Sequence, residues 1–278
     1  MCIRDRTSVA IVANDTAVRA QSSTSSVSCT PTSTLYLGIV RLATLPSLNM
    51  LSPVNAYPII AEMYLRFTYS NYPPSPLIEP QLGQSWSSNS NYTVWILTLK
   101  PNLKWDNGEP LNATDLWYSL YLYTQVDHGY IPFMYIKNVT ILNSTSVKVI
   151  LNQPDPNFIL QLTASSANFV ILPYQVYSKI PISQVAAYKN FENIVADGPF
   201  VIYNYTPGEN PIIFTANPYF YRGKPHMKKL VLYLFSSQEA YMSALEAGKL
   251  DALWASGGYS VVAPLAKLPG YKIYRITP

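Results

Sequence analysis

The stretch QLGQSWSSNSNYTVWILTLKPNLKWDNGEPLNATDLWYSL, residues 81–120, predicts a strand, a tight turn and a capped helix in that order. Residues 92–100 alternate with the period of two that is typical of a strand, and their aromatic and β-branched side chains favour the same assignment. One pleat face carries Trp95, Leu97 and Leu99, and the other carries Val94, Ile96 and Thr98. Residues 106–108, Asp-Asn-Gly, predict the turn, because Asn and Gly tolerate positive φ. Asn112 precedes Asp115 by three residues, which predicts a helix that begins with a capping box.

Three motifs within this stretch stand in register with one another: LGQSW at 82–86, YTVW at 92–95 and KWDNGEPLNATD at 104–115. Together they resemble the signature of the family 5 extracellular solute-binding proteins, the receptors that deliver peptides, nickel or oligosaccharides to ABC importers. The signature positions are Trp86, Trp95, Trp105, Gly108 and Asp115. Later segments follow the order of the family: ILP at 171–173, DGPF at 197–200, NPYFYRGKP at 217–225 and ALEAGKLDA at 244–252. Ala196 and Asp197 depart from the usual Gly-Thr, and the resemblance spans about 35–278.

The resemblance implies an α/β (mixed α+β) class, with a mixed sheet flanked by helices in a periplasmic-binding-protein-like lobe. It divides the chain into three parts. Residues 1–33 are expected to hold an artefactual start (MCIRDR), a signal remnant and a disordered linker. Residues 34–56 and 181–278 form a discontinuous lobe I, and residues 57–180 form a subdomain inserted into it. Because the family continues well beyond this length, we expect an N-terminal fragment that lacks the second lobe.

Elsewhere the pattern predicts further strands and helices. Alternation on both sides of 143–145 predicts a β-hairpin of 136–142 and 146–151. Further strands are predicted at 35–43, 200–205, 212–216, 229–235 and 250–254, and further helices at 57–67, after Asp155-Pro156, and from a Ser236 cap to Gly248. Residues 70–80 contain four prolines, which predict an extended loop.

Only 12% of the residues are charged, about half of the ~25% that ordinary soluble domains contain. The 23 tyrosines and many Asn, Ser and Thr residues supply neutral hydrogen-bonding groups instead. We hypothesise a protein that works outside the cell where carboxylates solubilise poorly, for example in acid. The net charge of +4 is not clustered, which argues against a nucleic-acid-binding face. No apolar run approaches the ~18 residues that cross a bilayer.

Export is indicated weakly by the N-terminus and mainly by the family. Residues 7–13 resemble the end of a signal-peptide apolar region with a cleavage site at 18–20, and a lipoprotein-like Cys29 is the alternative. The resemblance implies a secreted protein at the extracellular or periplasmic face of the cell membrane. Its partners would be an oligopeptide or oligosaccharide ligand and the membrane permease of an ABC importer. Membrane association would come through the permease or a missing anchor, and we expect a monomer with no nucleic-acid partner.

Catalytic and metal-binding patterns are sparse. His128 and His226 belong to no ligand-spaced cluster, and both cysteines precede residue 34, so the sequence predicts no zinc site and no disulfide. No nucleophile elbow or phosphate loop is present in the sequence. Asp106 and Glu109 share one turn, and nothing marks a pair of glycosidase carboxylates about 5–10 Å apart across a cleft. We expect no enzyme, metal or cofactor, with a secreted hydrolase and a surface adhesion protein as alternatives from other classes.

A binding protein needs a cleft, polar groups for the ligand and a hinge, rather than a reactive group. The resemblance gives three sets of candidate ligand contacts: Thr44, Leu45, Pro46 and Ser47 after the first strand, Gly198, Pro199 and Phe200 near the hinge, and Trp254 and Ser256 after the last strand. Each segment also fits an ordinary structural role. The signature tryptophans are expected to pack in the core, and the tyrosine content leans slightly towards sugars, whose faces stack on rings.

Six Asn-x-Ser/Thr sequons are present, at Asn14, Asn91, Asn112, Asn138, Asn143 and Asn204. N-glycosylation is one interpretation of these motifs, and chance occurrence in a chain with many Asn and Thr residues is the alternative. Asn112 is a poor acceptor if its side chain caps the predicted helix.

Overall fold

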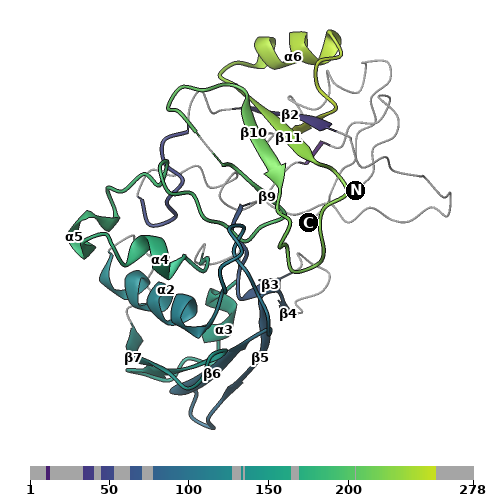
Figure 1. The fold of residues 1–278 in the computed structure, drawn as a ribbon. Helices are drawn as coiled ribbons and strands as arrows, with labels where there is room; N and C mark the ends of the chain where they lie inside the picture. Colours follow the sequence, from purple (N-terminus) through teal and green to yellow (C-terminus); the bar gives the residue numbers. More distant parts are fainter. Residues whose placement is uncertain are drawn as a thin grey trace, which may run out of the picture. The chain divides into compact units, whose positions relative to one another are not determined.

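The computed structural model describes residues 11–12, 34–40, 45–52, 63–70, 78–126, 133, 135–163, 169–203 and 205–254. The chain forms two compact units, drawn together in Figure 1. The first unit contains residues 1–45, 202–216 and 224–278, and the second contains 46–201 and 217–223. Both units combine helices and strands, as the α/β prediction requires. This division differs from the predicted inserted subdomain at 57–180, whose limits remain a prediction.

The second unit contains a four-stranded antiparallel sheet in the order β5-β6-β8-β7. Its strands are β5 (Gly83–Ser88), β6 (Val94–Leu99), β7 (Ile136–Ile141) and β8 (Ser146–Leu151). The predicted alternation of β6 is confirmed, because Trp95, Leu97 and Leu99 are buried while Ile96 is exposed. The predicted hairpin of β7 and β8 is also confirmed.

Helix α2 (Ala113–Gln125) packs against β7 and β8 and covers one face of this sheet (Figure 1). Its predicted capping box is confirmed: Asn112 Oδ1 accepts from Thr114 N at 2.8 Å, and Asp115 Oδ2 accepts from Asn112 N at 2.9 Å. The other helices among the described residues of this unit are one turn long: α3 (Phe158–Gln161), α4 (Tyr174–Tyr177) and α5 (Ile182–Val185). The strand β9 (Phe200–Val201) pairs next to β10 and covers only the first two residues of the strand predicted at 200–205.

Two predictions for the start of the second unit need correction. Of the helix predicted at 57–67, residues 57–62 lie outside the described residues, and 64–67 are not helical. Residues 66–67 instead hydrogen-bond the segment 81–83, and the chain enters β3 (Thr68–Ser70) directly. The strand β4 (Ile78–Pro80) pairs with β3, so the predicted extended loop at 70–80 ends in a short strand. In both cases backbone pairing between segments overrides the local pattern.

The first unit is built on the central strand β2 (Thr34–Val40). Strands β11 (Lys229–Phe235) and β12 (Ala252–Trp254) flank it as parallel neighbours. Beyond them, β10 (Ile212–Ala216) is antiparallel to β11, and β1 (Ile11–Val12) is parallel to β12. Helix α6 (Gln238–Glu246) connects β11 to β12. Its cap is Ser237, whose Oγ accepts from Ala240 N at 3.2 Å, and not the predicted Ser236.

Candidate functional site

The signature turn at 105–108 begins in the interior of the second unit, where Trp105 and Asp106 are buried, and reaches the surface at Asn107. Trp105 is completely buried. The backbone N–H of Trp105 donates to the carbonyl of Glu109, and the backbone N–H of Gly108 donates to the carbonyl of Trp105, each at 2.9 Å. Gly108 has a φ of +86°, in the left-handed region that favours glycine. A Cβ atom at this position would lie 3.3 Å from the ring of Tyr219, so the ring would have to shift slightly to admit a side chain.

Replacing Gly108 by alanine is expected to lower the free energy of unfolding by more than the same change at Gly223. Left-handed backbone costs an alanine roughly 1–2 kcal/mol, and both residues have such a φ, +86° and +92°. Only Gly108 has a side chain within 4 Å of the added Cβ, that of Tyr219. Urea unfolding of both variants measures the difference. Equal losses would show that the Tyr219 ring moves aside freely.

Asp115 joins the start of α2 to the ILP segment through two hydrogen bonds. Besides the bond from Asn112 N, its Oδ1 accepts from Tyr174 N at 3.0 Å. The carboxyl group is buried. Burial raises the pKa of Asp115 above its ordinary value, and the N–H groups of Asn112 and Tyr174 oppose that rise. This signature residue therefore acts as a structural connector.

Two further buried carboxyl groups, those of Asp106 and Asp197, lie at the Ala196-Asp197 step that departs from the family pattern. Asp106 Oδ1 accepts from Ala196 N at 2.8 Å, and Asp197 Oδ1 accepts from Leu65 N at 3.0 Å. Within the described part of the chain, the second oxygen of Asp197 has no hydrogen-bond partner. Burial raises the pKa of Asp106, and it raises the pKa of Asp197 well above its usual range. Neither group is accessible to a substrate.

The candidate contacts after β2 are largely buried. Leu45 is buried in the first unit, and its N–H donates to the Tyr205 hydroxyl at 3.3 Å. Ser47 has no exposed surface in the second unit, and its Oγ donates to the carbonyl of Lys189 and accepts from Asn49 N. Pro46 is half-buried, and Thr44 lies outside the described residues. The side chains of Leu45 and Ser47 are thus engaged by the protein itself.

The Gly198-Pro199 step is held by hydrogen bonds from both sides. Gly198 N donates to the carbonyl of Met63 at 2.7 Å, and the Gly198 carbonyl accepts from Asn217 Nδ2 at 3.0 Å. The Pro199 carbonyl accepts from Asn217 N at 2.9 Å. Phe200 is half-buried. These backbone groups are occupied within the second unit, which leaves a ligand little to bind here.

The last two predicted ligand contacts are Trp254 and Ser256. Trp254 ends β12, its side chain lies outside the described residues, and so does Ser256.

Among the residues that the structure describes, no group of three or more His, Cys, Asp or Glu side chains is arranged to hold a metal ion. In the same residues, no helix has the length and apolarity to cross a membrane.

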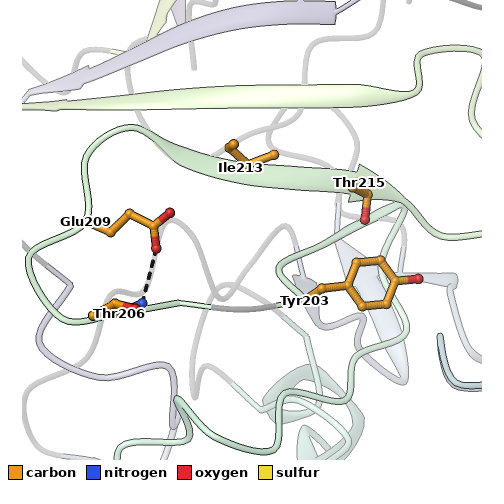
Figure 2. Close-up of a pocket in the computed structure, with 5 residues that line it drawn as sticks. All are labelled: Tyr203, Thr206, Glu209, Ile213 and Thr215. Carbon is orange, nitrogen blue, oxygen red and sulfur yellow. Dashed lines mark hydrogen bonds between the residues drawn. The ribbon is translucent and has the colours of Figure 1, made fainter.

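A pocket of about 570 Å³ opens on the first unit, beside β10 (Figure 2). It is lined by Tyr203, Thr206, Glu209, Ile213 and Thr215. The Tyr203 ring is 61% exposed, and one Glu209 oxygen accepts from Thr206 N at 3.1 Å. The Thr215 hydroxyl is buried and has no partner among the described residues. An exposed aromatic side chain, a carboxylate and an exposed isoleucine suit a small ligand with both polar and apolar parts.

Sequence reasoning did not identify this pocket. The alternation of Ile213 and Thr215 on one face of the predicted strand at 212–216 was a usable signal. The turn at Pro207-Gly208 brings Glu209 back to Thr206, whose N–H donates to the Glu209 carboxylate. The position of Tyr203 opposite β10 could not be predicted from the sequence, because it depends on how the chain folds back after residue 203 (Figure 2).

Three comparisons place these observations in a family. A family model described as bacterial extracellular solute-binding proteins, family 5 middle, matches residues 78–278. The periplasmic murein peptide-binding protein MppA of Escherichia coli is 26% identical over 196 residues, which cover 63% of this chain and 35% of that protein. The oligopeptide-binding protein OppA of Bacillus subtilis is 24% identical over 219 residues, which cover 69% of this chain and 36% of that protein.

Among solved structures, the binding protein MoaA from A. tumefaciens R10, in complex with mannopinic acid, matches with a TM-score of 0.71 at 23% identity. The match covers 84% of this chain and 47% of that chain, and it shows a shared fold. This chain spans about a third of the length of MppA and OppA. Because the family model matches most of the sequence, from residue 78 to its last residue, the chain belongs to the bacterial extracellular solute-binding proteins of family 5.

Proposed function

We propose that the protein is the substrate-binding component of an ABC importer and that its cargo is peptides. The family match over 78–278 carries this proposal. The relatives MppA and OppA are named for binding murein peptides and oligopeptides, which makes peptides the first choice. Proteins of family 5 bind solutes and catalyse no reaction.

The chemistry of the described residues supports binding over hydrolysis. A glycosidase or protease acid needs contact with its substrate. Asp106, Asp115 and Asp197 are all buried, with at most 6% of any of them exposed. Glu109 is exposed on the signature turn, and its backbone N–H is bound by Asn107 Oδ1. Asp106, Asp115 and Asp197 therefore make hydrogen bonds inside the second unit and have little surface to offer a substrate.

The proposed mechanism is capture between two lobes. A ligand would bind to this lobe first, and closure of a second lobe would bury it. The permease would recognise the closed form, so that affinity and conformation are coupled. Among the candidate contacts, the carbonyl oxygens of Leu45, Pro46 and Ser47 accept no hydrogen bond from the described residues. They are the atoms that we propose for the loop after β2, with Phe200, Trp254 and Ser256 as further candidates.

Oligosaccharides are the second candidate cargo. The observation that favours them is the exposed Tyr203 ring beside the open pocket of the first unit. Aromatic faces bind sugars by stacking, and the 23 tyrosines of the chain make such a surface easy to build. In either case we propose that the protein works as a monomer outside the cytoplasm, at the membrane face where its permease opens.

The test is thermal unfolding of the protein encoded by the complete gene, with and without ligands. Panels of di- to penta-peptides and of cello- and malto-oligosaccharides would be added at equal concentrations. A ligand at a hundred times its Kd stabilises the native state by about 2.7 kcal/mol, so a cognate peptide is expected to raise Tm by several degrees. A shift with sugars alone would replace the peptide assignment. Turnover of a substrate without any shift would contradict a binding protein.

A further inference from the structure

The six sequons share a feature that composition does not explain. Every one of them has threonine at the third position, although the chain has 27 serines and only 18 threonines. With 19 asparagines in 278 residues, random placement gives about one Asn-x-Thr and about two Asn-x-Ser tripeptides. The sequence has six of the first kind and none of the second. Abundance of Asn and Thr therefore does not account for them.

Three of these asparagines lie exposed on one small sheet of the second unit. Asn91 is in the turn between β5 and β6, Asn138 is on β7, and Asn143 is in the turn between β7 and β8. Antiparallel pairing puts the two turns at opposite ends of the sheet. Asn14 and Asn204 lie outside the described residues.

The bonds made by Asn143 are compatible with a modified side chain. Its Oδ1 accepts from the N–H groups of Thr145 and Ser146, each at 2.9 Å, and from the Thr145 hydroxyl at 3.1 Å. Its Nδ2 donates no hydrogen bond to the described residues. An N-linked sugar replaces one hydrogen on Nδ2 and leaves Oδ1 as an acceptor. The turn would therefore keep its structure after modification.

Asn138 lies on an edge strand, because β7 ends the order β5-β6-β8-β7. Exposed edges can pair with other chains, and bulky or charged groups prevent this. The Asn138 side chain is exposed, with Nδ2 3.4 Å from Thr140 Oγ1, at the long limit of a hydrogen bond. A sugar at this position would shield the edge and add neutral hydroxyl groups to a surface that has few charges.

Asn112 provides an internal contrast. It has the same Asn-x-Thr motif, but it is half-buried, and its Oδ1 is fixed by Thr114 N at the start of α2. The Oδ1 bond alone does not distinguish Asn112, because Asn143 Oδ1 also accepts backbone N–H groups. Partial burial does, so the structure separates three exposed sequons from one whose side chain is less accessible to a transferase.

We propose that Asn91, Asn138 and Asn143 are N-glycosylation sites that an extracytoplasmic oligosaccharyltransferase modifies. The donor would be a lipid-linked oligosaccharide pyrophosphate. The bond between the anomeric carbon and the phosphate oxygen breaks, a bond from that carbon to Nδ2 forms, and the displaced amide proton leaves with the lipid pyrophosphate. The inference rests on the export that the proposed function requires.

The test is mass spectrometry of the protein purified from its native cells, without deglycosylation. Trypsin places Asn112 on a different peptide from Asn91, and places Asn138 and Asn143 together on NVTILNSTSVK. The expected result is glycan mass at the three exposed sites and none at Asn112. Thr93→Ala and Thr140→Ala should each remove one glycan from the intact mass. Thr93→Ser and Thr140→Ser, which keep the motif, should remove none.

Bare Asn91, Asn138 and Asn143 in an exported protein would overturn the inference, and so would modification of Asn112 to the same extent. The same preparation is fractionated and tested for peptide and sugar binding. An exported, ligand-binding but unmodified protein overturns the glycosylation inference alone. A glycosylated protein that binds neither class of ligand supports the inference and overturns the proposed cargo.

Discussion

Replacing Trp105 by alanine is expected to lower the free energy of unfolding by about 3–5 kcal/mol, the usual cost of removing a large buried aromatic side chain. Trp105 has no exposed surface and lies at the start of the signature turn. Its removal leaves a cavity that the hydrogen-bonded turn, held to Glu109 and Gly108, cannot easily collapse into. Chemical denaturation of the variant, followed by fluorescence and circular dichroism, measures the loss.

Trp86 provides the matched control for this prediction. It belongs to the same signature and the same unit, but it is half-buried on β5, with its ring 6.4 Å from that of Phe67. Because the transfer free energy scales with the area removed from water, Trp86→Ala is expected to cost clearly less. A smaller loss at Trp105 than at Trp86 would contradict the buried position of Trp105. Ligand affinity per folded molecule should stay unchanged in the Trp105 variant, since a fully buried ring stacks on no sugar.

Stability is expected to increase when the pH falls from 8 towards 4, and Asp197→Asn is expected to remove much of this increase. Burial raises the folded-state pKa values of Asp106, Asp115 and Asp197 above those of an unfolded chain, near 4. At a pH between their unfolded-state and folded-state pKa values, these carboxyl groups are protonated in the folded protein and ionised in the unfolded chain. Stability from these groups is therefore complete below pH 4 and is lost as the pH rises through their folded-state pKa values.

Asp197 is expected to dominate this effect, because one of its oxygens has no partner among the described residues. The asparagine variant keeps an oxygen for the N–H of Leu65 and carries no charge. It should match the parent near pH 4 and exceed it at pH 8 by at least about 1 kcal/mol, because the variant buries no charge, and an unsatisfied charged group costs more than the ~1–3 kcal/mol of a neutral one. Urea unfolding at pH 4, 6 and 8 gives the three differences.

Glu109→Gln is the control for the pH experiment. Glu109 is an exposed carboxyl group in the same unit, so this variant removes one negative charge from the surface and leaves the three buried carboxyl groups in place. A parent protein that loses stability steadily from pH 8 to pH 4 would contradict the prediction. The same result would also contradict the hypothesis that the protein is adapted to acid, which rests on its low content of charged residues.

The segment 81–120 was predictable because its structure depends on near neighbours. Alternation fixed which side chains of β6 are buried, and the Asn-Gly turn and the Asn112 cap depend on residues at most a few positions away. The fold class followed from the same segment, and the family match confirms the resemblance that it carries. Local hydrogen bonds and side-chain periodicity act the same way in any context, so sequence alone determined these elements and their family.

Tertiary structure decided everything that depends on segments far apart in the chain. Sequence gave no indication that Asp197 would bind Leu65 N across more than a hundred residues, or that Ser47 would bind Lys189. Arg66 and Phe67 are not helical as predicted, because their carbonyl groups accept hydrogen bonds from the backbone of residues 81–83. Burial is a property of packed surroundings, and it sets both the pKa values of the carboxyl groups and the access of a ligand. Those surroundings exist only once distant segments have come together, so the fold, and not the motif, decides which candidate residues a ligand can reach.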